Sequence, residues 1–378
     1  MRSFLLLTGA TGLLGRYLIR DLTARGVAVA ALVRRQGAEP AAARLARVVA
    51  ATAGPTDPPA TQGPAPVCLE GNVNLPGLGL AAADAAWAAR HCGRLVHSAA
   101  SLEFRTSPRT GDPDRTNREG TARVLDFCRR AEIAEFHHVS TAYVCGLSDG
   151  LVREGDPTGG RGFRNDYERS KAEAERLIRA ADFLDRPTFH RPAVIVGDSQ
   201  TGFTSTYHGL YPYLQCIDLL RRHLDVPPGQ PWSIPVRLNL TGDEGRNLVP
   251  VDWVSAAIAD LVGDPACRGR TYHLTPGRAV TVREIEAAAA EVFGYDGPSF
   301  VGPLGLPAGS RNEFEERFYE AVGLYQPYWA GEPAFDGANT RAALPDRPCP
   351  DVDRALLCRL IRFAIGDRWG RAARNSRR

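Results

Sequence analysis

The chain has 378 residues, more than one small core requires, so we expect one large domain with a smaller partner. Hydrophobic residues make up 44% and charged residues 24%, as in globular enzymes, and the net charge of +3 argues against nucleic acid as a partner. No apolar run approaches the ~20 residues of a membrane span, and the N-terminal apolar run is too short for a signal peptide. The eight cysteines form no CxxC pair and have no metal-ligand spacing, which predicts reduced thiols of a cytoplasmic protein and no metal site.

The first half of the chain alternates short β-rich runs with helical stretches. Repeated βα units of this kind form a parallel sheet with helices on both faces, so the predicted fold is a Rossmann-type, doubly wound α/β sheet. An alanine-rich stretch over 41–51 and the Pro-rich segment 56–66 interrupt the pattern, and we expect a surface excursion there. The predicted buried strands are Phe4 to Leu7, Val27 to Val33, Val67 to Leu69, Leu95 to His97 and Phe136 to Val139, with helices over Leu13 to Arg25 and Thr116 to Ala131.

The regular alternation of β-rich runs and helical stretches ends near residue 201, where we place the start of a smaller substrate-binding lobe. Residues 1–200 would form the dinucleotide-binding domain, and 201–378 the smaller lobe, with about 245–280 returning to the larger domain. The tail after Gly294 is expected to be irregular and aromatic until a helix near Val352 to Ile365. The other predicted elements are helices over Tyr207 to Leu224, Val251 to Val262 and Val282 to Val292, and strands over Ser233 to Leu240 and Thr271 to Leu274.

A glycine-rich turn follows the first strand. In the segment from Thr8 to Gly15, Gly9, Gly12 and Gly15 form a GxxGxxG pattern between a predicted strand and a predicted helix. Glycines allow the tight turn, the approach of a pyrophosphate and close helix packing, and the helix N-terminus faces the phosphates. We therefore predict a dinucleotide site that also includes Thr11, Leu13 and Leu14.

The end of the second strand indicates which dinucleotide is bound. Arg34 and Arg35 stand where an acidic residue would bind the ribose hydroxyls of NAD. An arginine matches the geometry and charge of a 2′-phosphate, so the sequence favours NADP(H). The alternative is that the two arginines only solvate a helix start.

Tyr167 and Lys171 lie four residues apart in a stretch that becomes helical, so their side chains share one face. An ammonium group near a phenol lowers the pKa of that phenol and helps it to exchange a proton. Ser140 and Thr141 follow a predicted strand upstream, and either would donate a hydrogen bond to a substrate oxygen, unless it only caps the strand end.

These motifs resemble the extended short-chain dehydrogenase/reductase superfamily. Within it the chain is similar to thioester reductase domains and to the fatty acyl-CoA reductase group of male-sterility type, over roughly Phe4 to Glu284. The segments that carry the resemblance, in family order, are TGATGLLG, LVRR, HSAAS, NREGT, HVSTAYVCG, YERSK, RPAVIVGDSQTG, NLVPVDWV and YHLTPG.

The resemblance implies site residues and a reaction. Thr141, Tyr167 and Lys171 would be catalytic, with Thr141 preferred to Ser140, and Lys171 would also bind the nicotinamide ribose. NADPH would reduce a small-molecule acyl thioester, bound to CoA or to a carrier protein, to an aldehyde, and a second round could give the alcohol. Asn72 replaces the usual aspartate beside adenine and keeps only a carbonyl acceptor. The further residues implied to contact the cofactor are Val73, Ser98, Ala99, Ala100, Pro192, Ala193, Val194 and Ile195.

Other functions remain open from the sequence. The main alternative is an NADP-dependent carbonyl reductase or hydroxyl dehydrogenase in specialised metabolism, and weaker ones are a nucleotide-sugar epimerase or a non-catalytic NADP(H)-binding protein. The sequence shows neither an adenylation nor a carrier domain, so an acyl carrier protein would dock in trans. A homodimer through the helices that flank the sheet would be in keeping with the superfamily. Tyr207, Tyr211 and Tyr213 could line an acyl pocket, although core packing is the more common role of such aromatic residues.

Overall fold

The structure is a computed structural model, and it describes residues 2–52, 63–148, 150–227, 230–307, 309–329 and 331–371. The chain divides into two compact units. The first unit comprises residues 1–193, 254–274 and 334–348, and the second comprises 194–253, 275–333 and 349–378.

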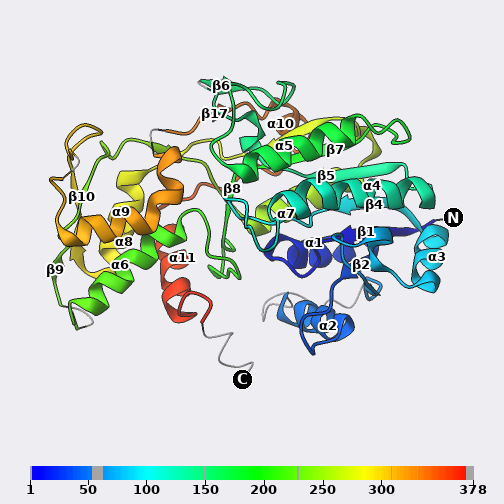
Figure 1. Cartoon of the computed structure of the whole chain (residues 1–378), viewed down its shortest axis with the longest axis horizontal. Coiled ribbons are helices and arrows are strands. Elements are labelled where there is room, and N and C mark those ends of the chain that lie inside the picture. The colour runs from blue at the N-terminus through cyan, green and yellow to red at the C-terminus, as the bar shows by residue number, and fades with distance from the viewer. Residues whose placement is uncertain are drawn as a thin grey trace. The chain divides into compact units, whose positions relative to one another are not determined.

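A seven-stranded sheet forms the centre of the first unit (Figure 1). All its neighbouring strands are parallel, and their order is β13-β7-β5-β4-β1-β2-β3. This arrangement confirms the predicted Rossmann-type α/β class, and each predicted buried strand is present with an end shifted by three residues or fewer. The strands are β1 (Phe4–Thr8), β2 (Ala28–Val33), β3 (Val67–Glu70), β4 (Cys92–His97), β5 (Glu135–Val139), β7 (Thr188–Pro192) and β13 (Thr271–Leu274).

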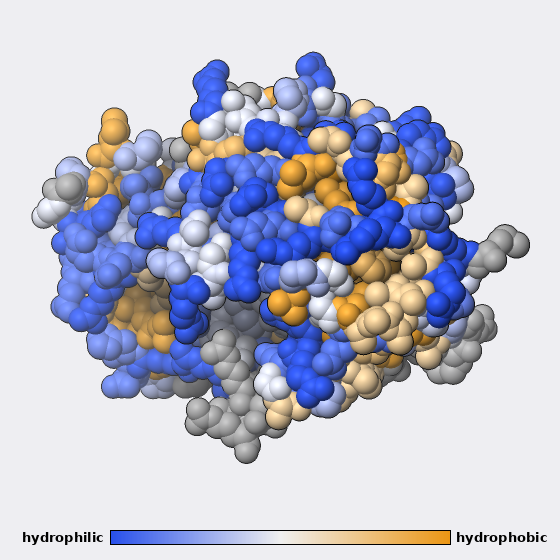
Figure 2. Space-filling model, turned by 45° about the vertical axis from the view of Figure 1, so that its right-hand side comes forward, coloured by the Kyte–Doolittle hydropathy of each residue, from blue (hydrophilic) through white to orange (hydrophobic). Residues whose placement is uncertain are grey.

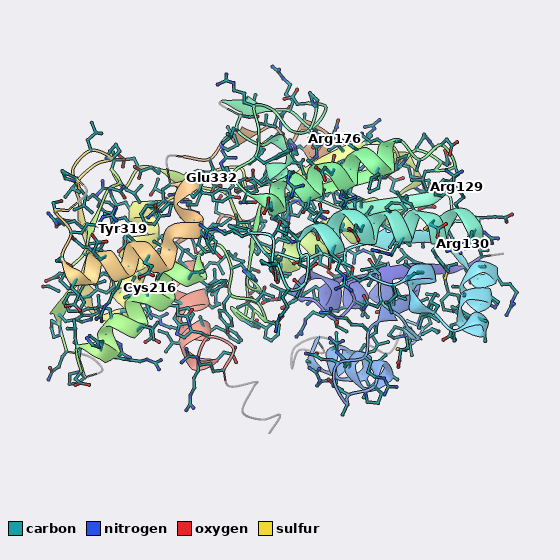
Figure 3. The ribbon with its side chains drawn as sticks, in the orientation of Figure 1. Arg129, Arg130, Arg176, Cys216, Tyr319 and Glu332 are labelled. Carbon is teal, nitrogen blue, oxygen red and sulfur yellow. The ribbon has the colours of Figure 1, made fainter. Side chains whose placement is uncertain are left out.

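Helices pack against this sheet. The predicted helix over Thr116 to Ala131 begins as a π-helical turn, η2 (Arg115–Glu119), and continues as α4 (Gly120–Ala131). Helix α4 runs beside α5 (Asp166–Arg179), as Figure 1 shows, and Figure 3 shows Arg129, Arg130 and Arg176 on these two helices. The other helices of the unit are α1 (Leu13–Ala24), α2 (Ala41–Thr52), η1 (Pro76–Gly79), α3 (Ala82–His91), η3 (Ala142–Cys145), η4 (Pro265–Cys267) and α10 (Ala338–Ala343), while β6 (Leu151–Val152) pairs with β17 (Ala334–Phe335).

The strand order reverses between β1 and β4. From β1 the chain adds β2 and β3 on one side, and then returns to place β4 on the other side of β1. Ligands of such sheets bind at this reversal, beyond the carboxyl ends of the strands. The loops that follow β1, β4, β5 and β7 all leave the sheet at this edge, and these loops carry most of the predicted site residues.

Short strands and longer helices build the second unit. Its pairs are β8 with β12, β10 with β16 and β9 with β15, all parallel, and β11 with β14, antiparallel. Helix α7 (Val251–Gly263) begins in this unit and ends in the first. The elements are β8 (Val194–Val196), α6 (Tyr211–His223), β9 (Trp232–Ser233), β10 (Arg237–Leu238), β11 (Gly245–Arg246), β12 (Leu248–Pro250), β14 (Val280–Thr281), α8 (Val282–Phe293), β15 (Tyr295–Asp296), β16 (Ser299–Phe300), α9 (Glu313–Val322), η5 (Gly323–Tyr328) and α11 (Arg354–Gly366).

Two expectations for this unit are wrong. The strand predicted over Ser233 to Leu240 is split into β9 and β10, because Pro235 has no N–H to donate to a sheet ladder. The tail after Gly294 is not irregular throughout, since α9 lies in it and carries Phe318 and Tyr319 on its buried face. The Asn312 side chain accepts from Glu315 N, and Glu315 bonds back to Asn312 N, so a capping box starts this helix.

The three tyrosines considered for an acyl pocket, Tyr207, Tyr211 and Tyr213, have separate roles. Tyr211 is buried and its hydroxyl accepts from Gly197 N at 3.0 Å, while Tyr207 donates to Asp367. Tyr213 lines a cavity of about 370 Å³ between α6 and α9, the helices that carry Cys216 and Tyr319 in Figure 3. Apolar side chains form most of the cavity wall, with His223 and Arg317 among the lining residues.

Hydrophilic side chains cover much of the face drawn in Figure 2, with apolar side chains gathered in smaller groups between them. In the part of the chain that the structure describes, no helix has the length and apolarity needed to cross a membrane. That part also contains no group of three His, Cys, Asp or Glu side chains able to hold a metal ion.

Candidate active site

The glycine-rich turn joins β1 to α1. Gly9 has φ +75°, and a Cβ there would lie 2.6 Å from Ala99 N, so the loop after β4 packs directly on the turn. A Cβ at Gly15 would lie 2.0 Å from Gly9 O, which explains why the helix needs glycine to approach the strand. At Gly12 the nearest atom to such a Cβ, Gly9 O, is 3.3 Å away.

Helix α1 begins after Gly12 with no side-chain cap and no acidic residue in its first turn. The backbone N–H groups of this turn therefore have no side-chain acceptor from the cap position, and the positive end of the helix dipole is not neutralised. These are the features that bind a pyrophosphate, so the residues present fit a dinucleotide. Thr11, Leu13 and Leu14 belong to this turn, as the sequence predicts.

Thr8 connects the turn to the loop after β4. Its Oγ1 accepts hydrogen bonds from Ser98 N and Ala99 N, both at 3.2 Å, and lies 2.7 Å from His97 Nδ1. Ser98 and Ala99 are half-buried and Ala100 is exposed. The structure thus brings two of the predicted ribose-lining residues, Ser98 and Ala99, beside the glycine-rich turn.

Three arginines lie around the end of β2. Arg34 is exposed and, among the described residues, no carboxylate pairs with it, whereas Arg35 pairs with Glu70 at 3.1 Å. Sequence reasoning missed Arg44, which is buried on α2 and donates to Arg34 O and, at 3.2 Å, to Thr11 Oγ1. The sequence pattern that could have indicated its burial is that Arg44 shares a helical face with the apolar residues Leu45 and Val48.

Asn72 forms a local turn. Its Oδ1 accepts from Asn74 N at 3.0 Å, and its own N–H donates to Leu78 O at 2.7 Å. The Val73 side chain packs in the hydrophobic core with Leu69 and Leu78. One lone pair of the Asn72 carbonyl is therefore already used within the loop.

A side-chain cap starts α5, the helix that carries Tyr167 and Lys171. The Asn165 side chain accepts from Glu168 N at 2.9 Å, which fixes the first turn of the helix. Tyr167, Lys171 and Glu175 then follow at intervals of one turn on a single face.

The Thr141 side chain lies close enough to the Tyr167 phenol to influence its pKa. Thr141 follows β5, and its Oγ1 lies 3.4 Å from the carbonyl oxygen of Pro192, the last residue of β7. Burial raises the pKa of the Tyr167 phenol above its usual value of 10, and Thr141 only partly offsets this shift. The phenol therefore keeps its proton at neutral pH in the protein alone.

Ser140 has a different neighbour. It is buried, its N–H donates to His190 O at 2.7 Å, and its side chain helps to lower the pKa of the Glu175 carboxyl. Burial alone would raise that pKa, but Arg191 outweighs it with two bonds of 2.9 and 2.8 Å. Of the two adjacent hydroxyl residues, Thr141 acts on the pKa of Tyr167, whereas Ser140 acts on that of Glu175 without forming a hydrogen bond of normal geometry.

Lys171 is the only lysine of the chain, and it is buried under the site. Its Nζ donates to Val139 O at 2.6 Å and lies 3.4 Å from His138 Nε2. Burial lowers the pKa of Lys171 from 10.5 to about 8, while Glu175 acts in the opposite direction. At neutral pH the side chain is still mostly an ammonium.

Of the residues predicted around the nicotinamide, Pro192 ends β7 and Ala193 follows it, both in the first unit. Ala193 N donates to Leu274 O at 3.0 Å, which ties this loop to β13. Val194 and Ile195 belong to β8 in the second unit and pair with β12.

A parallel Rossmann sheet with a glycine-rich turn at its reversal point and a Thr-Tyr-Lys set beside it defines an NAD(P)-dependent oxidoreductase of the extended short-chain dehydrogenase/reductase class. The chain belongs to the male sterility protein family, whose model matches residues 7–258. This membership confirms the family that the sequence motifs suggested.

Known proteins similar to the chain include reductases of two kinds. One is the L-2-aminoadipate reductase large subunit of Penicillium chrysogenum, 28% identical over 77% of this chain, although the chain spans only 21% of that protein. Another is the 4-hydroxy-2-methyl-3-oxo-4-farnesyl-3,4-dihydroquinoline-1-oxide ketoreductase of Stigmatella aurantiaca, 35% identical over 54% of this chain and 53% of the relative. Among solved structures, the terminal R domain of the myxalamid PKS-NRPS biosynthetic pathway has a TM-score of 0.75 and 25% identity, covering 97% of this chain and 91% of that domain.

Proposed function

We propose that the protein is an NADPH-dependent reductase of acyl thioesters, bound to CoA or to a carrier protein, that releases an aldehyde and a thiol. The observation that carries this proposal is the placement of Tyr167 and Lys171 one turn apart on α5, with the Thr141 side chain near enough to lower the pKa of the Tyr167 phenol. The similarity to a terminal R domain of a PKS-NRPS pathway supports a thioester as the substrate. A carrier protein would then be the partner that presents it.

The proposed chemistry assigns a task to each side chain. When bound, the reduced nicotinamide supplies a hydride for the acyl carbon. Thr141 and Tyr167 hold the carbonyl oxygen with their hydroxyl groups and stabilise the negative charge that develops on it. Tyr167 transfers its proton to that oxygen, and Lys171, one helical turn away, would bind the ribose of the nicotinamide. The resulting hemithioacetal loses its thiol to give the aldehyde.

NADP(H) is the proposed cofactor because of the arginines at the end of β2. Arg34 is exposed without a carboxylate partner among the described residues. Arg44 lies next to it and donates a hydrogen bond to the backbone carbonyl of Arg34. A guanidinium there would pair with a 2′-phosphate.

Arg34→Ala is expected to weaken NADPH binding about ten- to hundredfold and to leave NADH binding within about twofold, because only the 2′-phosphate contact is lost. Arg35→Ala is the matched control, since Arg35 already pairs with Glu70. Fluorescence titration of both variants with NADPH and NADH measures the effect. Equal losses for the two cofactors, or a larger loss in Arg35→Ala, would contradict the assignment.

A second candidate function is reduction of a free ketone or aldehyde, which the similarity to a ketoreductase favours. Product analysis separates the two functions. With a panel of acyl-CoA substrates and NADPH, the thioester function predicts one free thiol, detected with a thiol reagent, for each aldehyde formed. Turnover of free carbonyls together with no thiol release from any thioester would replace the first function by the second.

A further inference from the structure

A buried histidine lies against the lysine of the site. His138 is the fourth residue of β5 and is only 1% exposed, and its Nε2 is 3.4 Å from Lys171 Nζ. An ammonium group has only hydrogen atoms to offer, so Nε2 must be the acceptor in this contact. The proton of the neutral ring is then on Nδ1.

Nothing in the described part of the chain accepts that proton, because His138 Nδ1 is buried without a hydrogen-bond partner. Buried polar groups in folded proteins are nearly always paired, and exceptions are often found at functional sites. The rings of His97 and Phe189 pack against His138 with centroids 5.4 and 6.3 Å away. Fold stability alone would be better served by an apolar side chain at this position.

The charged and titratable groups around the ring keep it neutral. Burial contributes most to lowering the pKa of His138, followed by Lys171, His97, His190 and Arg179. Each of these neighbours opposes a positive charge on the ring. His138 therefore stays a neutral acceptor throughout the pH range in which Lys171 titrates.

We propose that His138 is a positioning residue, whose Nε2 on strand β5 accepts a hydrogen bond from Lys171 Nζ and so orients the ammonium group. Val139 O and His138 Nε2 engage two of the three N–H bonds of Lys171, and the third is left for a ligand. The ring also acts as an acceptor that stabilises the charged form of a lysine removed from water. Calling the lysine catalytic rests on the function proposed above, but its contact with His138 does not.

The chain itself offers a clean test, because Lys171 is its only lysine. Protein labelled with ¹³C-lysine should give a single Cε resonance, and a pH titration of that resonance reports the pKa of Lys171 without any substrate. In the natural protein we expect a pKa of about 8. In His138→Leu, where the acceptor is lost and burial is kept, this pKa should fall by about one unit, a tenfold shift in the protonation equilibrium.

Two further variants separate positioning from simple packing. His138→Gln keeps an acceptor at the position of Nε2 and should restore most of the pKa. His190→Leu removes a histidine that is equally buried, on the neighbouring strand β7, and that stacks on His137 instead of contacting Lys171, so the pKa should stay near 8. If His138→Leu does not fold, His138→Asn replaces it, because its amide is too short to reach Nζ.

An unchanged Lys171 pKa in His138→Leu, or an equal shift in His190→Leu, overturns the proposal. In a second arm, the alkaline limb of the kcat/KM profile for NADPH and an acyl-CoA should move to lower pH in His138→Leu by the same amount as the NMR titration. If no thioester is reduced at all, the proposed function fails while the titration still decides the role of His138.

Discussion

Tyr167→Phe is expected to lower kcat for NADPH-dependent reduction by about two to four orders of magnitude, because it removes the group that gives its proton to the substrate oxygen. The phenyl ring keeps its volume and its packing near Phe104, whose ring centroid is 6.2 Å away. Binding of NADPH should stay within about twofold, since the glycine-rich turn and Lys171 are untouched. Steady-state kinetics and cofactor titration on the same preparation measure both effects.

Tyr272→Phe is the matched control for this variant. Tyr272 is fully buried on β13, and its hydroxyl donates to Cys267 O at 2.8 Å. Tyr272→Phe therefore also deletes one buried phenol oxygen, but at a position that does not contact Thr141. We expect a modest loss of stability and a kcat near that of the natural protein. A Tyr167→Phe protein with more than about a tenth of the natural kcat would exclude Tyr167 as the proton donor.

Arg191→Met should destabilise the protein by about 3–5 kcal/mol, the usual consequence of leaving one member of a buried ion pair without its partner. Arg191 is 2% exposed and Glu175 is fully buried, and two hydrogen bonds join them. Arg179 also contacts Glu175 at 3.3 Å, but its side chain is half exposed and replaces only part of the lost interaction. Equilibrium urea unfolding of the two proteins measures the difference.

The double variant Glu175→Met/Arg191→Met tests the cause of that loss. Replacing both charges with apolar side chains of similar length should recover most of the stability, because no charge is then left unpaired. A double variant as unstable as Arg191→Met would show that packing, and not the unpaired carboxylate, is responsible.

The pH dependence of this ion pair has a definite sign. The folded protein holds the pKa of Glu175 below its ordinary value, so the pair contributes stability above the unfolded-state pKa of about 4.3. This contribution is lost as the pH falls through the lower pKa of the folded state.

Individual elements show which parts of the fold could be predicted from local sequence patterns. The apolar runs of β1 and β2 indicated buried parallel strands, and the motifs from the glycine-rich turn to YERSK indicated the family, which the comparison confirms. The prediction failed at Pro235, where a missing N–H divides the expected strand, and at α9, where the Asn312–Glu315 capping box was overlooked. The individual roles of the site residues remain predictions, and the experiments above address them.

Local patterns in the sequence were enough to predict the fold class and the spacing of Tyr167 and Lys171, because strand and helix periodicities and turn glycines are local properties of the chain. The residues that surround that pair became known from the three-dimensional structure. The strand order β13-β7-β5-β4-β1-β2-β3 brings Thr141 to Tyr167, Arg191 to Glu175 and His138 to Lys171 across 16 to 33 residues of chain. Such contacts depend on strand register and helix packing, which are set by the whole core and leave no short-range signal in the chain.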